Sequence, residues 1–105
     1  AQRVSLELAK IGSRGVSLLF ASGDDGVGSN GAFRPNFPAT SPWVTSVGGT
    51  ILGNGDSESA WSSSSGGFSN FFPRPSYQDK AVAGYIAEAG DKLPPQRDYN
   101  ATGRG

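Results

Sequence analysis

The chain has 105 residues and a formal net charge of zero, from nine Lys or Arg and nine Asp or Glu. Balanced charge provides no electrostatic attraction to nucleic acid or to an anionic membrane, so we expect neither as a partner. The chain has no Cys and no His, which excludes disulfides, imidazole metal sites and Ser-His-Asp catalysis within it. Any acid–base chemistry here must therefore use carboxylates, Lys, Tyr or water.

The first elements indicate an α/β fold. Residues 2–11 predict a helix, because Val4, Leu8 and Ile11 share one helical face. Residues 15–22 form a short apolar run typical of a strand buried on both faces. A helix, a short turn and a buried strand predict a parallel sheet flanked by helices.

The middle of the chain alternates loops and short strands. Residues 23–42 are rich in Gly and Pro and predict a long irregular loop. Residues 43–50 are rich in β-branched side chains and predict a second strand. Residues 51–61 predict a hairpin, since Asn54 and Gly55 form a favoured tight-turn pair.

The last third is expected to contain one helix between loops. The serine-rich residues 62–69 predict a flexible polar loop. Ser76 is a candidate cap for a helix over residues 77–90, with Asp79 in its first turn. Residues 91–105 are expected to be coil.

Two ligand motifs overlap the first glycine-rich loop, and both are disfavoured. Residues 26–31 match G-x-G-x-x-G, but a dinucleotide site needs a helix at the third Gly, whereas prolines follow here. Asp24, Asp25 and Asn30 do not have the spacing of a calcium-binding loop, and no bidentate Glu follows. A structural loop is the favoured interpretation of both patterns.

Other candidates have weaker support. The serines from Ser62 to Ser65 lack a neighbouring base, so a polar loop is favoured over a nucleophile. Asn100-Ala101-Thr102 is an N-glycosylation sequon, which in a secreted protein marks a surface loop. Packing is favoured over a sugar-binding platform for the aromatic residues Trp43, Trp61, Phe71, Phe72 and Tyr77.

Asp24 remains open to two interpretations on this reasoning. A carboxylate after a parallel strand lies where open α/β sheets bind ligands. An Asp at this position also commonly stabilises a turn, here through Gly26. The strand–Gly–Asp pattern alone does not decide between the two roles.

Four segments, taken together, favour one of these two interpretations of Asp24. "FASGDDG", "FRPNFPATSPWVTSVGGT", "SGGFSNFFPRPSYQ" and "YNATGRG" occur in order along the chain. With this set, residues 1–105 closely resemble the sedolisin family of serine-carboxyl peptidases, in particular its tripeptidyl-peptidase branch. The resemblance implies a partial subtilisin-like fold with a parallel sheet, flanking helices and long Gly/Pro-rich loops.

The resemblance also implies a role for Asp24. The family motif S-G-D-x-G matches Ser22 to Gly26, and its Asp donates to the oxyanion of the tetrahedral intermediate. Asp24 would hold that role, Ser22, Gly23 and Gly26 would shape the turn, and Asp25 would occupy the variable position. A protonated carboxyl can donate a hydrogen bond where a carboxylate would repel the oxyanion, so an acid pH optimum is expected.

The rest of the family's site has no match here. The nucleophilic Ser, its Glu base, the Asp beside that Glu and the calcium site are expected outside residues 1–105. We therefore expect an internal fragment of a catalytic domain that is inactive alone and needs no cofactor of its own. The whole enzyme would bind calcium, cleave peptides or proteins, and be secreted, with a lysosomal or vacuolar location as the alternative. A non-catalytic secreted binding domain on the same scaffold is the competing hypothesis.

Overall fold

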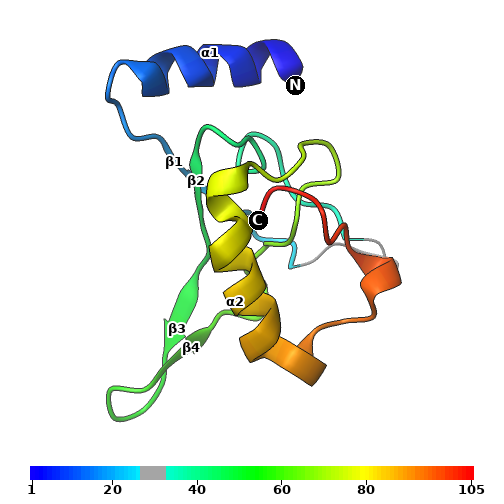
Figure 1. Cartoon of the computed structure of the whole chain (residues 1–105). Coiled ribbons are helices and arrows are strands. Elements are labelled where there is room, and N and C mark those ends of the chain that lie inside the picture. Colours follow the sequence, from blue (N-terminus) through cyan, green and yellow to red (C-terminus); the bar gives the residue numbers. More distant parts are fainter. Residues whose placement is uncertain (27–32) are drawn as a thin grey trace.

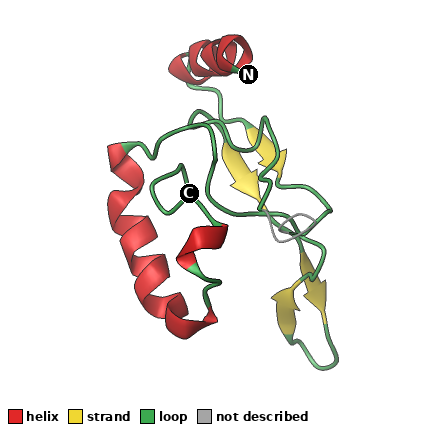
Figure 2. Cartoon of the chain, turned by 90° about the vertical axis from the view of Figure 1, so that its right-hand side faces the viewer, coloured by secondary structure: helices red, strands yellow, loops and turns green. Residues whose placement is uncertain are grey.

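The computed structural model describes residues 1–26 and 33–105 of the chain. Helix α1 lies at one end of the molecule, while α2 lies beside the C-terminal residue (Figure 1). Two small sheets lie to one side of α2, one near α1 and the other at the opposite end of the molecule (Figure 2). The elements are α1 (Gln2–Ser13), β1 (Leu19–Ala21), β2 (Thr45–Val47), β3 (Thr50–Leu52), β4 (Glu58–Ala60) and α2 (Asp79–Ala89).

Helix α1 confirms the first expected helix but not its expected buried face. Leu8 is buried, whereas Val4 is 50% and Ile11 is 37% exposed. The second buried position is Ser5, whose hydroxyl is hydrogen-bonded to the buried hydroxyl of Ser41 at 2.8 Å. The helix thus meets the body of the protein along a narrow, partly polar line, so the apolar periodicity overstated its burial.

Strands β1 and β2 pair in parallel, as their sequences predicted. Leu19 lies opposite Thr45, and Ala21 lies opposite Val47. The expected burial of the first strand on both faces is wrong for the described residues, since Leu19 is 67% exposed. Neither α1 nor α2 packs against this two-stranded sheet in the described part of the chain, so no helical layer covers its faces.

Strands β3 and β4 form the expected antiparallel hairpin. Thr50 lies opposite Ala60, and the Gly53 N–H donates to the Ser57 carbonyl at 2.8 Å. Gly55 at the tip has a φ of 68°, a left-handed value that glycine adopts without strain. The hairpin projects from the rest of the chain (Figure 1, Figure 2), and all six strand residues are exposed.

The serine-rich segment 62–69 is not the flexible loop that its composition predicted. Ser65, Phe68 and Ser69 are buried. The Ser69 hydroxyl accepts from the N–H of Phe71 at 3.1 Å and of Phe72 at 2.8 Å. This side-chain hydroxyl replaces the backbone acceptors that an irregular segment lacks. The segment can therefore pass through the interior.

Helix α2 begins later than expected, and Ser76 is not its cap. Ser76–Gln78 form a 3-10 turn, the helix starts at Asp79, and no side chain caps it. Arg74 Nε donates to Asp79 Oδ1 at 3.0 Å and holds the helix entrance instead. The predicted coil after α2 contains two short 3-10 turns, Gly90–Lys92 and Gln96–Asp98.

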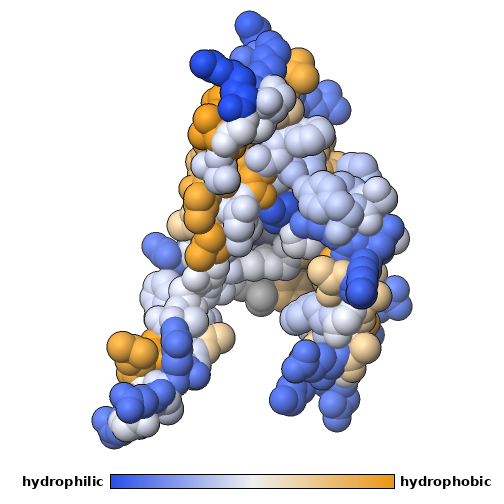
Figure 3. All heavy atoms as spheres, turned by 60° about the vertical axis from the view of Figure 1, so that its left-hand side comes forward, coloured by the Kyte–Doolittle hydropathy of each residue, from blue (hydrophilic) through white to orange (hydrophobic). Residues whose placement is uncertain are grey.

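The interior is small, and much apolar surface remains exposed. The structure is of the α/β class, with a parallel and an antiparallel sheet beside two helices. Apolar side chains form a band at the surface along one flank of the molecule (Figure 3). Trp43, Phe71 and Tyr77 are all more than half exposed, so of the expected core or rim packing only a place at the rim fits them. Among residues 1–26 and 33–105, the buried apolar side chains are Leu8, Ala39, Val44, Phe68 and Val82.

Candidate functional site

The turn Ser22–Gly26 follows β1 directly and carries the candidate carboxylate. The Ser22 N–H donates to the Val47 carbonyl at 2.9 Å, which extends the β1–β2 pairing by one residue. Gly23 has a φ of 114° and Gly26 a φ of 60°. These left-handed values strain residues with side chains, which explains the glycines on both sides of Asp24.

Ser65 and Asn36 hold this turn from two sides. The Ser65 N–H donates to the Gly23 carbonyl at 2.9 Å, and its hydroxyl accepts from the Asp25 N–H at 3.0 Å. Asn36 Nδ2 donates to the Ser22 carbonyl at 3.3 Å. The turn is therefore tied by backbone and side-chain bonds to segments far along the chain.

Gly23 also fits because these partners leave no room for a side chain. A Cβ at Gly23 would overlap the Asn36 amide and come 2.9 Å from the Ser65 hydroxyl. Ser65 and Asn36 were not identified from the sequence as site residues. Ser65 stands in a serine run whose members are equivalent by sequence, and Asn36 lies in a loop without a motif.

Asp24 and Asp25 occupy different surroundings, although they are adjacent. Asp24 is exposed and lines a cavity of about 420 Å³ together with Gly48, Gly49 and Trp61. Asp25 is not among the residues that line this cavity, and its backbone N–H is bound to Ser65. The structure thus brings Asp24, but not Asp25, to the mouth between the ends of β1 and β2.

The glycine pair that follows β2, Gly48 and Gly49, also lines this cavity. The Gly49 N–H donates to the Ser64 hydroxyl at 2.8 Å, and the Trp61 N–H donates to the Gly49 carbonyl at 3.1 Å. A Cβ at Gly48 would lie 2.9 Å from the Ser64 hydroxyl. Small residues therefore let the backbone approach the serine segment closely and keep the space beside Asp24 open.

No ion pair to Asp24 is present in the described part of the chain, whose ion pairs are Lys10–Glu7, Arg74–Asp79 and Arg97–Asp98. The Asp24 carboxyl faces solvent at the cavity mouth.

The alternative ligand motifs receive no support from the described residues. Gly28, Asn30 and Gly31 lie outside the described residues. Residues 33–42 form loop and turns rather than the helix that a pyrophosphate site needs. Within residues 1–26 and 33–105, no three acidic side chains cluster closely enough to hold a metal ion.

The sequon residue Asn100 lies in another part of the fold and is half-buried. Asn100 Nδ2 donates to the Ser69 carbonyl at 2.7 Å, and Asn100 Oδ1 accepts from Thr102 Oγ1 at 2.9 Å. One amide hydrogen is thus used within the protein. The second hydrogen is the one that a glycan would replace.

The comparisons with known proteins agree on one group of relatives. Tripeptidyl-peptidase 1 from Bos taurus is 50% identical over 111 aligned residues, covering 98% of this chain and 20% of the relative. The proteins of that name from Macaca fascicularis and Homo sapiens are 50% and 49% identical, with the same coverage. No family model matches the chain.

Two further findings limit what can be inferred about this chain from these relatives. The chain spans about one fifth of their length. Among the described residues, no helix has the length and apolar character needed to cross a membrane. Because the identity is near one half over almost the whole chain, the chain belongs to the sedolisin family of serine-type peptidases, of which tripeptidyl-peptidase 1 is a member.

Proposed function

We propose that residues 1–105 are part of the catalytic domain of a tripeptidyl-peptidase, in which Asp24 donates a hydrogen bond to the oxyanion. The observation that carries this proposal is the position of Asp24. It follows a parallel strand, on a turn tied at both ends, at the mouth of an open cavity. The relatives named tripeptidyl-peptidase 1 support the reaction class.

In the proposed mechanism, a Ser nucleophile supplied by sequence outside residues 1–105 attacks the peptide carbonyl. A Glu accepts its proton and an Asp supports that Glu. The carbonyl oxygen then becomes an oxyanion, and the protonated Asp24 carboxyl donates a hydrogen bond to it. On collapse of this intermediate the Glu returns its proton to the leaving amine, and an acyl-enzyme remains. Water, deprotonated by the same Glu, then hydrolyses the acyl-enzyme, and the Glu gives its proton back to the Ser oxygen. Ser22, Gly23 and Gly26 shape the turn, which Ser65 and Asn36 hold.

The whole protein has further proposed properties. We propose a subtilisin-like domain that is completed by sequence on both sides of this chain, and a secreted enzyme, with a lysosomal or vacuolar location as the alternative. We also propose that the full domain binds a calcium ion at a site outside residues 1–105, and no step here depends on it.

The decisive experiment compares three variants of the protein produced with its flanking sequence. Asp24→Ala removes the donor, and kcat for a tripeptidyl substrate at acid pH is expected to fall roughly 100- to 1000-fold. Asp24→Asn keeps an N–H donor at every pH, so it should retain more activity than Asp24→Ala and extend activity toward neutral pH. Asp25→Ala is the matched control, because its side chain does not line the cavity, and should stay within about threefold of the wild type.

Two results would contradict the proposal. Equal losses for Asp24→Ala and Asp25→Ala would indicate that the turn tolerates no change and that Asp24 has no separate role. A longer protein without peptidase activity would favour a binding domain on this scaffold.

A further inference from the structure

Arg104 is buried with an incomplete set of partners. Its exposed fraction is 6%, and Nη2 donates to the Val44 carbonyl at 2.7 Å. Nε is shielded from solvent and has no acceptor among the residues that the structure describes. A buried donor without an acceptor is uncommon in folded proteins and implies a missing partner.

The positive charge of Arg104 also has no counter-ion in this chain. None of the ion pairs in the described residues includes Arg104. Residues 27–32 read Val-Gly-Ser-Asn-Gly-Ala and contain no acidic side chain. No Asp or Glu of the 105-residue sequence therefore compensates Arg104. Burial lowers the pKa of the guanidinium, with an opposing effect from Tyr77, but an arginine remains charged at acid and neutral pH.

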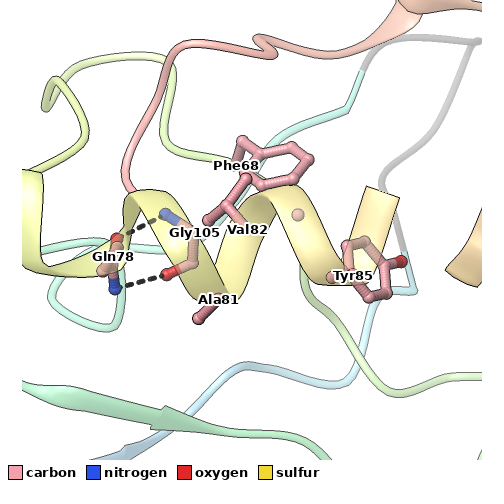
Figure 4. A pocket seen from close by; sticks show the side chains of 7 residues that line it. Phe68, Gln78, Ala81, Val82, Tyr85 and Gly105 are labelled. Atoms are coloured by element: carbon pink, nitrogen blue, oxygen red, sulfur yellow. Dashed lines mark hydrogen bonds between the residues drawn. The ribbon is translucent and has the colours of Figure 1, made fainter. Parts of the chain in front are cut away.

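The backbone around Arg104 is held firmly, so its burial is built into the fold. The Arg104 N–H donates to the Phe72 carbonyl at 3.0 Å, and the Arg104 carbonyl accepts from the Ser69 N–H at 2.8 Å. The next residue, Gly105, is bound by the Gln78 side chain (Figure 4). Its N–H donates to Gln78 Oε1 at 2.9 Å, and Gln78 Nε2 donates to its carbonyl at 3.3 Å.

A cavity of about 410 Å³ adjoins this arginine. Ser22 also lines it, and the Ser22 hydroxyl is the other buried polar atom without a partner among the described residues. The cavity therefore adjoins a cation that lacks a counter-ion in this chain. A carboxylate complements this cation, because it carries one negative charge and accepts several hydrogen bonds.

We propose that this cavity receives a carboxylate side chain from sequence outside residues 1–105, which pairs with the Arg104 guanidinium. A permanent partner is favoured over the carboxylate of a peptide substrate, since the guanidinium is already withdrawn from water in the folded chain. The length of the relatives leaves ample sequence to supply it. The inference is independent of any role for Asp24.

The first test is a crystal structure of the protein produced with its flanking sequence, without substrate. We expect a carboxylate oxygen of an Asp or Glu outside residues 1–105 within about 4 Å of the Arg104 guanidinium. A guanidinium that meets only water or backbone would overturn the proposal. So would a guanidinium that acquires a carboxylate only when a peptide with a free C-terminus is added.

The second test is a double-mutant cycle in the same protein, between Arg104→Met and removal of the carboxylate found. Each single variant should lower the melting temperature. The decrease in the double variant should be smaller than the sum of the decreases in the two single variants. Arg97→Met is the matched control, because that side chain is 84% exposed, and should leave the melting temperature unchanged. Additive losses would contradict the pairing. If Arg104→Met does not fold, the wild-type structure still decides the question.

Discussion

Ser65 and Gly23 form the contact that positions the candidate carboxylate. The Ser65 N–H donates to the Gly23 carbonyl at 2.9 Å, and the Ser65 hydroxyl accepts the N–H of Asp25, two residues further on. The turn that carries Asp24 is thus spanned by one serine from the segment after β4. Its geometry depends on Ser65 as much as on its own glycines.

Removing the Ser65 hydroxyl should loosen this turn. Ser65→Ala leaves the Asp25 N–H without its acceptor, and we expect a loss of about 1 kcal/mol in the free energy of unfolding. In the longer enzyme, kcat should fall more than KM changes, because the turn would position Asp24 less well. Denaturant unfolding and steady-state kinetics measure these effects. Ser62→Ala, at an exposed position, is the control, and an equal effect there would refute the positioning role.

Replacing either of two glycines by alanine should change the free energy of unfolding, with opposite signs at the two positions. Gly23→Ala places a methyl group on a residue with a φ of 114° and against Asn36 and Ser65, so we expect a loss of about 2 kcal/mol or more. Gly12→Ala lies within α1 with no atom within 4 Å of the new Cβ, and should stabilise the protein by up to about 1 kcal/mol. Thermal unfolding of both variants checks the signs, and a stable Gly23→Ala protein would mean that the turn differs from the one described.

The 105-residue chain is expected to show no peptidase activity, because the proposed nucleophile and base lie outside it. The measurement is incubation of the purified chain with a tripeptidyl substrate at about pH 4, in the range where the carboxyl groups protonate. Turnover that Asp24→Ala abolishes would show that the chain holds a complete site and that the mechanism above is wrong.

The same chain is expected to be poorly stable or to aggregate. Leu19 is 67% and Leu52 is 78% exposed, and the outer edges of both two-stranded sheets are unpaired in the described residues. Such edges and apolar patches favour association. Size-exclusion chromatography and a circular-dichroism melt test this, and a sharply melting monomer would contradict it.

Variants of the sequon can distinguish glycosylation of Asn100 from the hydrogen bond that its side chain donates to the Ser69 carbonyl. Secretion from a eukaryotic host should add a glycan at Asn100, which a glycosidase removes with a measurable loss of mass. Thr102→Ala abolishes the sequon yet keeps the Asn100 amide that donates to Ser69, whereas Thr102→Ser preserves both. An unmodified wild-type protein would refute the prediction.

Local pattern predicted the type of several elements but not their burial. The helical period of residues 2–11 and the tight-turn pair at Asn54 depend on neighbouring residues, and both elements are present. The expected cap at Ser76 is absent because that residue belongs to a 3-10 turn. The exposure of Leu19 depends on which elements pack on the faces of the sheet, and the sequence of a single strand does not contain that information.

The sequence by itself determined the α/β class, the strand–turn–carboxylate pattern at Asp24 and the family, since each depends on short-range order or on similarity along the chain. Only the tertiary structure separated Asp24 from Asp25 by their surroundings, placed Ser65 against a turn 40 residues away, and buried Arg104 against Val44, 60 residues away. The physical reason is distance along the chain: these hydrogen bonds form between segments that share no local pattern, and packing alone brings them together.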